Sequence, residues 1–93
     1  MLTSPREQRY FQLVARTLDL LRFQAESEQT DAQQDLAIEI RRAVFAILKS
    51  CSPENLHYLR QLLLLGCEME AWSESHVHRY LEAIDELAAT EQG

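Results

Sequence analysis

The sequence of 93 residues is long enough for one small domain, residues 1–93, and its 46% hydrophobic residues supply a core, which argues against disorder. Two glycines and two prolines are too few for the many tight turns of a β-sandwich or barrel. The formal charge of −6 arises in residues 51–93, which hold two basic and eight acidic residues. Such a surface repels nucleic-acid phosphates and favours a basic protein as partner.

The compartment is predicted from what the sequence lacks. No apolar run approaches the roughly 18–20 residues that cross a bilayer, so no membrane partner is expected. The N-terminal residues lack the apolar core of a secretory signal. Cys51 and Cys67 match no metal-binding or redox spacing, so we expect two reduced thiols. Together these features predict a cytoplasmic protein.

The first predicted helix covers residues 5–28. The segment Ser4-Pro5-Arg6-Glu7 combines an N-cap serine, a proline at the first helical position and a glutamate at the third, which predicts a capping box. Phe23 lies outside the main apolar arc of this helix. The residues predicted to face the core are Tyr10, Phe11, Leu13, Val14, Thr17, Leu18, Leu20, Leu21 and Ala25.

The second predicted helix covers residues 31–49 and begins with another capping box, Thr30-Asp31-Ala32-Gln33. Its predicted core stripe is Leu36, Ile40, Ala43, Val44 and Ile47. Ile38 and Phe45 lie seven residues apart, nearly opposite this stripe. A pair one heptad apart on the outer face suits a helix–helix contact with a partner. We therefore predict a protein interface that includes Phe23, Ile38 and Phe45.

The third predicted helix covers residues 53–71, after Ser52-Pro53 at its start. Four consecutive leucines, residues 62–65, point around the whole cylinder, whereas one stripe is enough to face a core. Such a helix must be covered on several sides, which predicts a central position and homodimerisation with Leu62 and Leu65 in the interface. Gly66 either ends this helix as a C-cap or lets a neighbouring helix approach closely, and the unbroken apolar phase favours a continuous helix.

The fourth predicted helix covers residues 74–90 and is capped by Ser73 or Ser75. Its opposite face carries Arg79, Glu82 and Glu86. The predicted core stripe is Val77, Tyr80, Leu81, Ile84, Leu87 and Ala88. Four helices with short connections predict an all-α, antiparallel four-helix bundle, completed or extended by homodimerisation.

Histidine phosphotransfer is one alternative function. The segment His57-Tyr58-Leu59-Arg60-Gln61 resembles the His-x-x-Lys/Arg-Gly helix of histidine-phosphotransfer domains. The resemblance implies that His57 carries the phosphoryl group and that Arg60 steadies it. The sequence departs from the pattern at Gln61, which stands where that family has glycine.

DNA binding is the other alternative. Residues 73–82 resemble the start of a helix-turn-helix recognition helix, and Gly66 resembles its turn glycine. The distance from Gly66 to Val77 exceeds the short turn of that motif. Only Arg79 in this segment would anchor a phosphate, and Glu74 and Glu82 flank it.

Enzymatic chemistry has little support. The only Glu-x-x-His spacing, Glu54 to His57, lacks the second copy that a di-iron site needs, and His76 and His78 diverge on a helix. Two glycines cannot build a phosphate-binding loop, and no cofactor or metal is predicted. We therefore expect a non-enzymatic protein–protein interaction module, a regulator, adaptor or inhibitor of an unidentified partner protein, acting as a homodimer.

Overall fold

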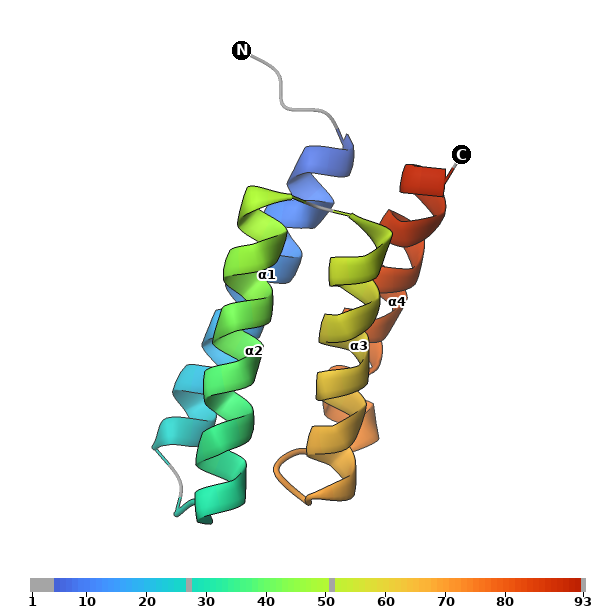
Figure 1. Cartoon of the computed structure of the whole chain (residues 1–93). Helices are drawn as coiled ribbons and strands as arrows, with labels where there is room; N and C mark the ends of the chain where they lie inside the picture. Colours follow the sequence, from blue (N-terminus) through green and yellow to red (C-terminus); the bar gives the residue numbers. More distant parts are fainter. Residues whose placement is uncertain (1–4, 27, 51, 93) are drawn as a thin grey trace.

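The computed structural model describes residues 5–26, 28–50 and 52–92, and the described residues form four helices and no strand. These are α1 (Pro5–Ala25), α2 (Asp31–Lys49), α3 (Pro53–Glu68) and α4 (Glu74–Gln92). The chain is an all-α four-helix bundle, as predicted, and each described helix begins where the sequence places it (Figure 1). No described helix is long and apolar enough to cross a membrane.

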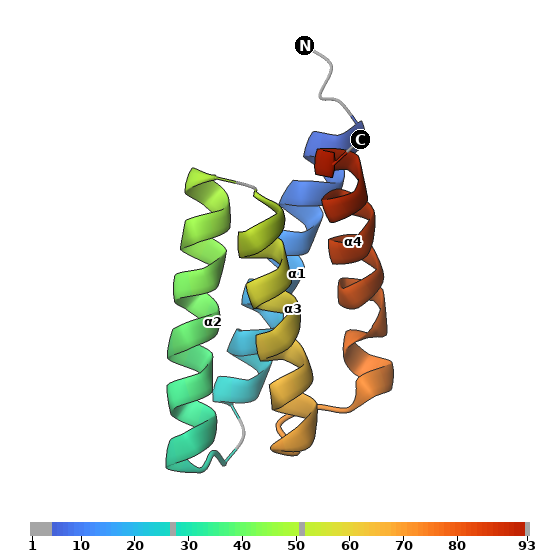
Figure 2. The same cartoon turned by 45° about the vertical axis from the view of Figure 1, so that its right-hand side comes forward.

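Successive helices run in opposite directions, so the start of α1 and the end of α4 lie at the same end of the bundle (Figures 1 and 2). α3 packs extensively against both α2 and α4, whereas α1 packs mainly against α4 and much less against α2. Within a single chain, α3 therefore has closely packed neighbours on two sides. One edge of the bundle, between α1 and α2, is the least closely packed.

Side-chain caps explain where three helices start. The Thr30 hydroxyl accepts the amide of Gln33 at 3.1 Å, and the Gln33 side chain accepts the amide of Thr30 at 3.2 Å, which completes the predicted capping box. Ser52 caps α3, with Pro53 in its first turn. Ser73, rather than Ser75, caps α4, because its hydroxyl accepts the amide of His76. The predicted cap at Ser4 lies outside the described residues.

α1 ends at Ala25 and α3 at Glu68, each three residues before its predicted end. At the end of α3, the Ala71 amide donates to the carbonyl of Gly66 at 2.9 Å and the Glu70 amide to that of Cys67 at 3.1 Å. This is a Schellman motif. Its left-handed position is Glu70, with φ of 60°. Glycine is the usual residue there, so the sequence does not signal this end.

Glu70→Gly should therefore stabilise the protein by about 1 kcal/mol, because glycine adopts a positive φ without the steric cost borne by a residue with a Cβ. Chemical denaturation would measure the change in the free energy of unfolding. Glu68→Gly, two residues earlier and inside α3, is the matched control and should destabilise by about 1 kcal/mol. Stabilisation by both variants, or by neither, would contradict a left-handed Glu70.

Gly66 lies inside α3, which confirms the continuous helix, but its close neighbour is a side chain rather than a helix. A Cβ built on Gly66 would meet Cζ2 and Cε2 of Trp72, in the α3–α4 connection. The indole Nε1–H donates to the carbonyl of Leu63 at 2.9 Å, which holds the ring against the helix. Trp72 thus belongs to the core between α3 and α4, a role that the sequence analysis missed.

The core of α1 is narrower than predicted. Leu13, Leu20 and Leu21 are buried, but Phe11, Leu18 and Ala25 are exposed, so their predicted place in the core is wrong. The physical reason is the loose α1–α2 edge, where no helix covers this side of α1. The predicted stripes of α2 and α4 are confirmed, apart from partial exposure of Tyr80, Leu81 and Ala88.

Candidate functional site: the α1–α2 face and the α1–α4 groove

An exposed apolar surface lies along the open edge between α1 and α2. We call it the α1–α2 face. Each of its large apolar side chains is at least 43% exposed. Its members are Phe11 and Leu18 of α1, and Ile38, Phe45 and Leu48 of α2.

The contacts that α1 and α2 make with their neighbours show which sides of the two helices stay uncovered, and the exposed apolar side chains lie on those sides. The Tyr58 hydroxyl donates to Glu39 and the Asn55 amide to the Ala46 carbonyl, so α3 covers that side of α2. The Tyr10 hydroxyl donates to the Ile47 carbonyl at 3.0 Å, which joins α1 to the opposite side. By helical periodicity, the five apolar residues of the face point away from the core, on the outer side of the contact between α1 and α2.

Charged residues of both signs border the α1–α2 face. Asp19 and Glu26 lie exposed on the α1 margin, one position after Leu18 and Ala25. Arg42 and Lys49 lie exposed on the α2 margin. Arg22 of α1 and Arg41 of α2 are also exposed on this face, so its apolar side chains are interspersed with charges of both signs.

The predicted interface residues fall into three places. Ile38 and Phe45 lie together on the α1–α2 face, whereas Phe23 lies at the α1–α4 boundary, where its ring stacks with His76. Leu62 is 8% exposed and packs in the core of a single chain. Leu65 is 42% exposed beside Met69, in a shallow pocket between α2 and α3. The monomer alone therefore covers most of the four-leucine segment.

Phe11, Leu18 and Leu48 are the members of the face that sequence reasoning missed. A signal was available for each of them. Leu48 follows Phe45 by three residues on the same stripe, and Phe11 and Leu18 are one heptad apart, as Ile38 and Phe45 are.

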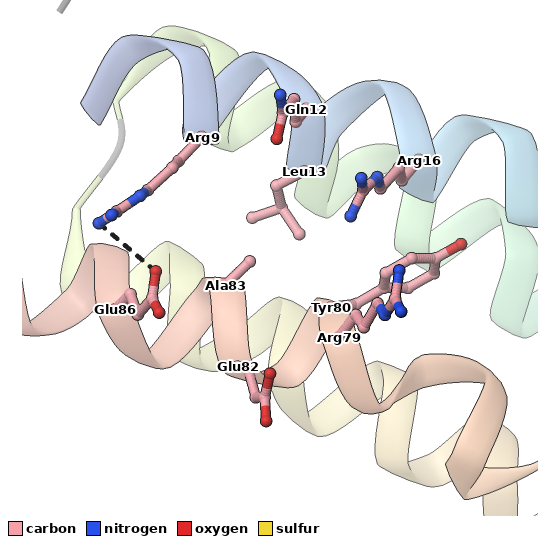
Figure 3. Close-up of a pocket in the computed structure, with 9 residues that line it drawn as sticks. All are labelled: Arg9, Gln12, Leu13, Arg16, Arg79, Tyr80, Glu82, Ala83 and Glu86. Atoms are coloured by element: carbon pink, nitrogen blue, oxygen red, sulfur yellow. Dashed lines mark ion pairs between the residues drawn. The ribbon is translucent and has the colours of Figure 1, made fainter. Parts of the chain in front are cut away.

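A groove along the α1–α4 boundary is the second surface feature. One of its pockets, of about 290 Å³, has Leu13 and Ala83 along its floor (Figure 3). Arg9 and Glu86 close one end with an ion pair of 3.4 Å. Arg16, Arg79 and Tyr80 lie together at the other end.

His57 is exposed in α3, and its Nε2 lies 3.2 Å from the side-chain nitrogen of Gln61, one turn further on. The Arg60 guanidinium binds Asp85 of α4 at 3.1 Å rather than pointing to His57. Residues 73–82 begin α4, which runs antiparallel to α3, whereas the two helices of a helix-turn-helix cross steeply (Figure 2). Arg60 thus pairs with α4 rather than with His57, and α3 and α4 form an antiparallel pair.

The described residues offer few reactive groups. No cluster of three or more His, Cys, Asp or Glu side chains among them could hold a metal ion. Cys67 is a free thiol, and burial, followed by the charges of Glu74 and Glu68, raises its pKa. A raised pKa lowers the thiolate fraction at neutral pH, so Cys67 is a poor nucleophile. Cys51 lies outside the described residues.

No protein-family model, curated protein or solved structure matches the chain.

Proposed function

We propose that the protein is a non-enzymatic interaction module, a regulator, adaptor or inhibitor of a partner protein, which self-associates through the α1–α2 face. The supporting observation is the gathering of five exposed large apolar side chains on the one loosely packed edge of the bundle. An apolar surface of this kind, bordered by charged residues, is typical of a protein interaction site.

A second copy fits this face by symmetry. In a two-fold dimer whose axis is parallel to the helices, α1 of each copy packs on α2 of the other copy. The α1 and α2 helices of the two copies, four helices in all, then pack together as the helices of a bundle do. Phe11 and Leu18 then pack against Ile38 and Phe45 of the second copy.

The partner protein is proposed to bind elsewhere, on the acidic surface of α3 and α4. Glu68, Glu70 and Glu74 are exposed near the α3–α4 connection, and none of them has an ion-pair partner among the described residues. These charges attract a basic surface and steer its approach. A free, half-buried thiol at Cys67 suits a reducing compartment such as the cytoplasm.

Light scattering behind size exclusion, over a range of concentrations, tests the proposal. We expect the wild type to form a dimer and Ile38→Glu/Phe45→Glu to be a monomer with unchanged helicity, because the side chains are exposed in the single chain. Four buried glutamates per dimer should raise the dissociation constant by about a hundredfold or more. Circular dichroism confirms the fold of each variant.

Leu65→Glu is the matched control, since Leu65 is also exposed but lies on the α2–α3 side. It should leave the dimer intact. If Leu65→Glu dissociates the dimer and the α2 double variant does not, the interface is on α3. A wild type that stays monomeric at all concentrations would refute self-association.

A further inference from the structure

Three hollows join into one groove along the α1–α4 boundary. The pocket of about 290 Å³ in Figure 3 shares Arg16, Arg79 and Tyr80 with a neighbouring hollow of about 440 Å³. That hollow shares His76 with a third pocket of about 220 Å³, at the α3–α4 connection. The groove thus leads from two arginines to the third pocket, which has aromatic walls.

The middle of the groove is built to attract an anion. Arg16 and Arg79 are exposed, and neither forms an ion pair with a described residue, although the chain carries a net charge of −6. Two of the nearby acids are already engaged, since Glu86 binds Arg9 and Glu82 lies 2.8 Å from His78, and Asp19 is the acid that shares this part of the groove with Arg16. Ser75 lines the same hollow, in the first turn of α4, where backbone amides also favour negative charge.

The third pocket has aromatic walls. Phe23 and His76 lie with their ring centroids 6.3 Å apart and their planes inclined by 26°. Stacked bases are spaced by about 3.4 Å, so a flat ring held between two others needs a gap of about 7 Å. Phe23 and His76 stack with each other here, and Phe23, which is 65% exposed, is free to swing outward and open this gap for a base. Trp72 forms another wall of this pocket.

Gln24 lines the same pocket and is 5% exposed, yet neither its Oε1 nor its Nε2 has a hydrogen-bond partner among the described residues. Burying an unpaired amide costs about 1–3 kcal/mol, so such groups in folded proteins call for an explanation. A glutamine amide offers one donor and one acceptor side by side, which pairs with N6 and N7 of adenine.

We propose that the α1–α4 groove binds an adenine nucleotide, with the base between Phe23 and His76, the Gln24 amide on the base edge, and the phosphate between Arg16 and Arg79. Arg16 and Phe23 are seven residues apart on α1, about 10 Å along the helix axis. The ribose of a nucleotide separates its base from its phosphate in the same way. An inorganic anion would use the arginines but would leave the aromatic walls and Gln24 without a role.

The sole tryptophan, Trp72, makes the test direct, because its fluorescence reports on the pocket that it lines. We expect titration with AMP to change the emission with a dissociation constant on the order of 100 µM, as suits a shallow, half-open site. Calorimetry provides a second readout. GMP should bind about tenfold more weakly, and adenosine and inorganic phosphate should each bind more weakly than AMP.

Variants assign the two ends of the groove. Arg16→Gln/Arg79→Gln should weaken the binding of AMP by about tenfold or more and leave the binding of adenosine unchanged. The charge-matched control is Arg41→Gln/Arg42→Gln on α2, which should leave AMP binding within twofold. Phe23 is exposed, so Phe23→Ala should leave the fold intact. It should weaken the binding of AMP and the binding of adenosine to the same extent. Gln24→Met should abolish the preference for AMP over GMP.

Three results would overturn the proposal. AMP at millimolar concentration could leave both fluorescence and heat unchanged. The Arg16/Arg79 variant could bind AMP as tightly as the control variant. Gln24→Met could keep the preference for AMP over GMP, in which case the amide reads no base. The groove and the α1–α2 face lie on different sides of α1, so failure of one proposal leaves the other standing.

Discussion

Gly66→Ala is expected to destabilise the protein by about 1–3 kcal/mol, although the same exchange at an exposed helical position stabilises by about 1 kcal/mol. The sign reverses because the added methyl group would overlap the Trp72 ring and lie 2.7 Å from its Nε1. The ring cannot retreat without losing the hydrogen bond from Nε1–H to the carbonyl of Leu63. Urea denaturation, with the slope compared between variants, measures the change in the free energy of unfolding.

The control for this prediction is the same substitution in a Trp72→Leu background. The smaller side chain lacks the indole atoms that the new methyl group would meet, so Gly66→Ala should there become neutral or stabilising. The double-mutant cycle isolates the contact between residues 66 and 72. Equal effects of Gly66→Ala in both backgrounds would show that the indole does not lie against this helix.

Leu63→Ala should destabilise the protein by about 2–5 kcal/mol, whereas Leu65→Ala should cost less than about 1 kcal/mol. The two leucines are two residues apart in α3, but Leu63 is fully buried and Leu65 is 42% exposed. Removing three carbons from the buried site leaves a cavity, and at the exposed site water fills the space. Thermal and chemical unfolding of the two variants under identical conditions provides the measurement.

Comparison of Leu63→Ala with Leu65→Ala also tests whether a second copy of the chain covers Leu65. In a dimer that buries this residue, the loss in Leu65→Ala would approach that in Leu63→Ala and would grow with protein concentration. A small, concentration-independent loss agrees with an interface on the α1–α2 face. Similar large losses in both variants would contradict that proposal.

Local signals in the sequence account for most of the fold. The cap at Thr30 and the Ser52-Pro53 pair each act within one turn of helix, so they are readable without knowledge of neighbours. The buried stripe of α2 also follows from periodicity alone. The exception is the end of α3, where the left-handed residue is Glu70 and no glycine marks it.

The candidate surfaces were less predictable, because they depend on how the helices face each other. The apolar arc of α1 is too wide for periodicity to show which side lies inside, so Phe11 and Leu18 were assigned to the core. Ile38 and Phe45 were identified as outward-facing because the α2 stripe is narrower. Trp72 lies in a connection with no periodic pattern, and its contact with Gly66 depends on the path of the whole α3–α4 turn.

The uneven packing of α1 has a consequence for synthesis of the chain. α1 leaves the ribosome before the other three helices of the bundle, but its main neighbour, α4, leaves after them, and the Arg9–Glu86 ion pair joins residues 77 apart in the sequence. Until α4 emerges, the inner stripe of α1, including Leu13 and Leu20, has only the sparse contacts with α2 to cover it. The α2–α3–α4 contacts join sequence neighbours and close short loops, so they form sooner. We therefore expect α1 to dock last, after α4 has emerged. Until then, the apolar stripe of α1 is exposed on the nascent chain, and chaperones can bind it.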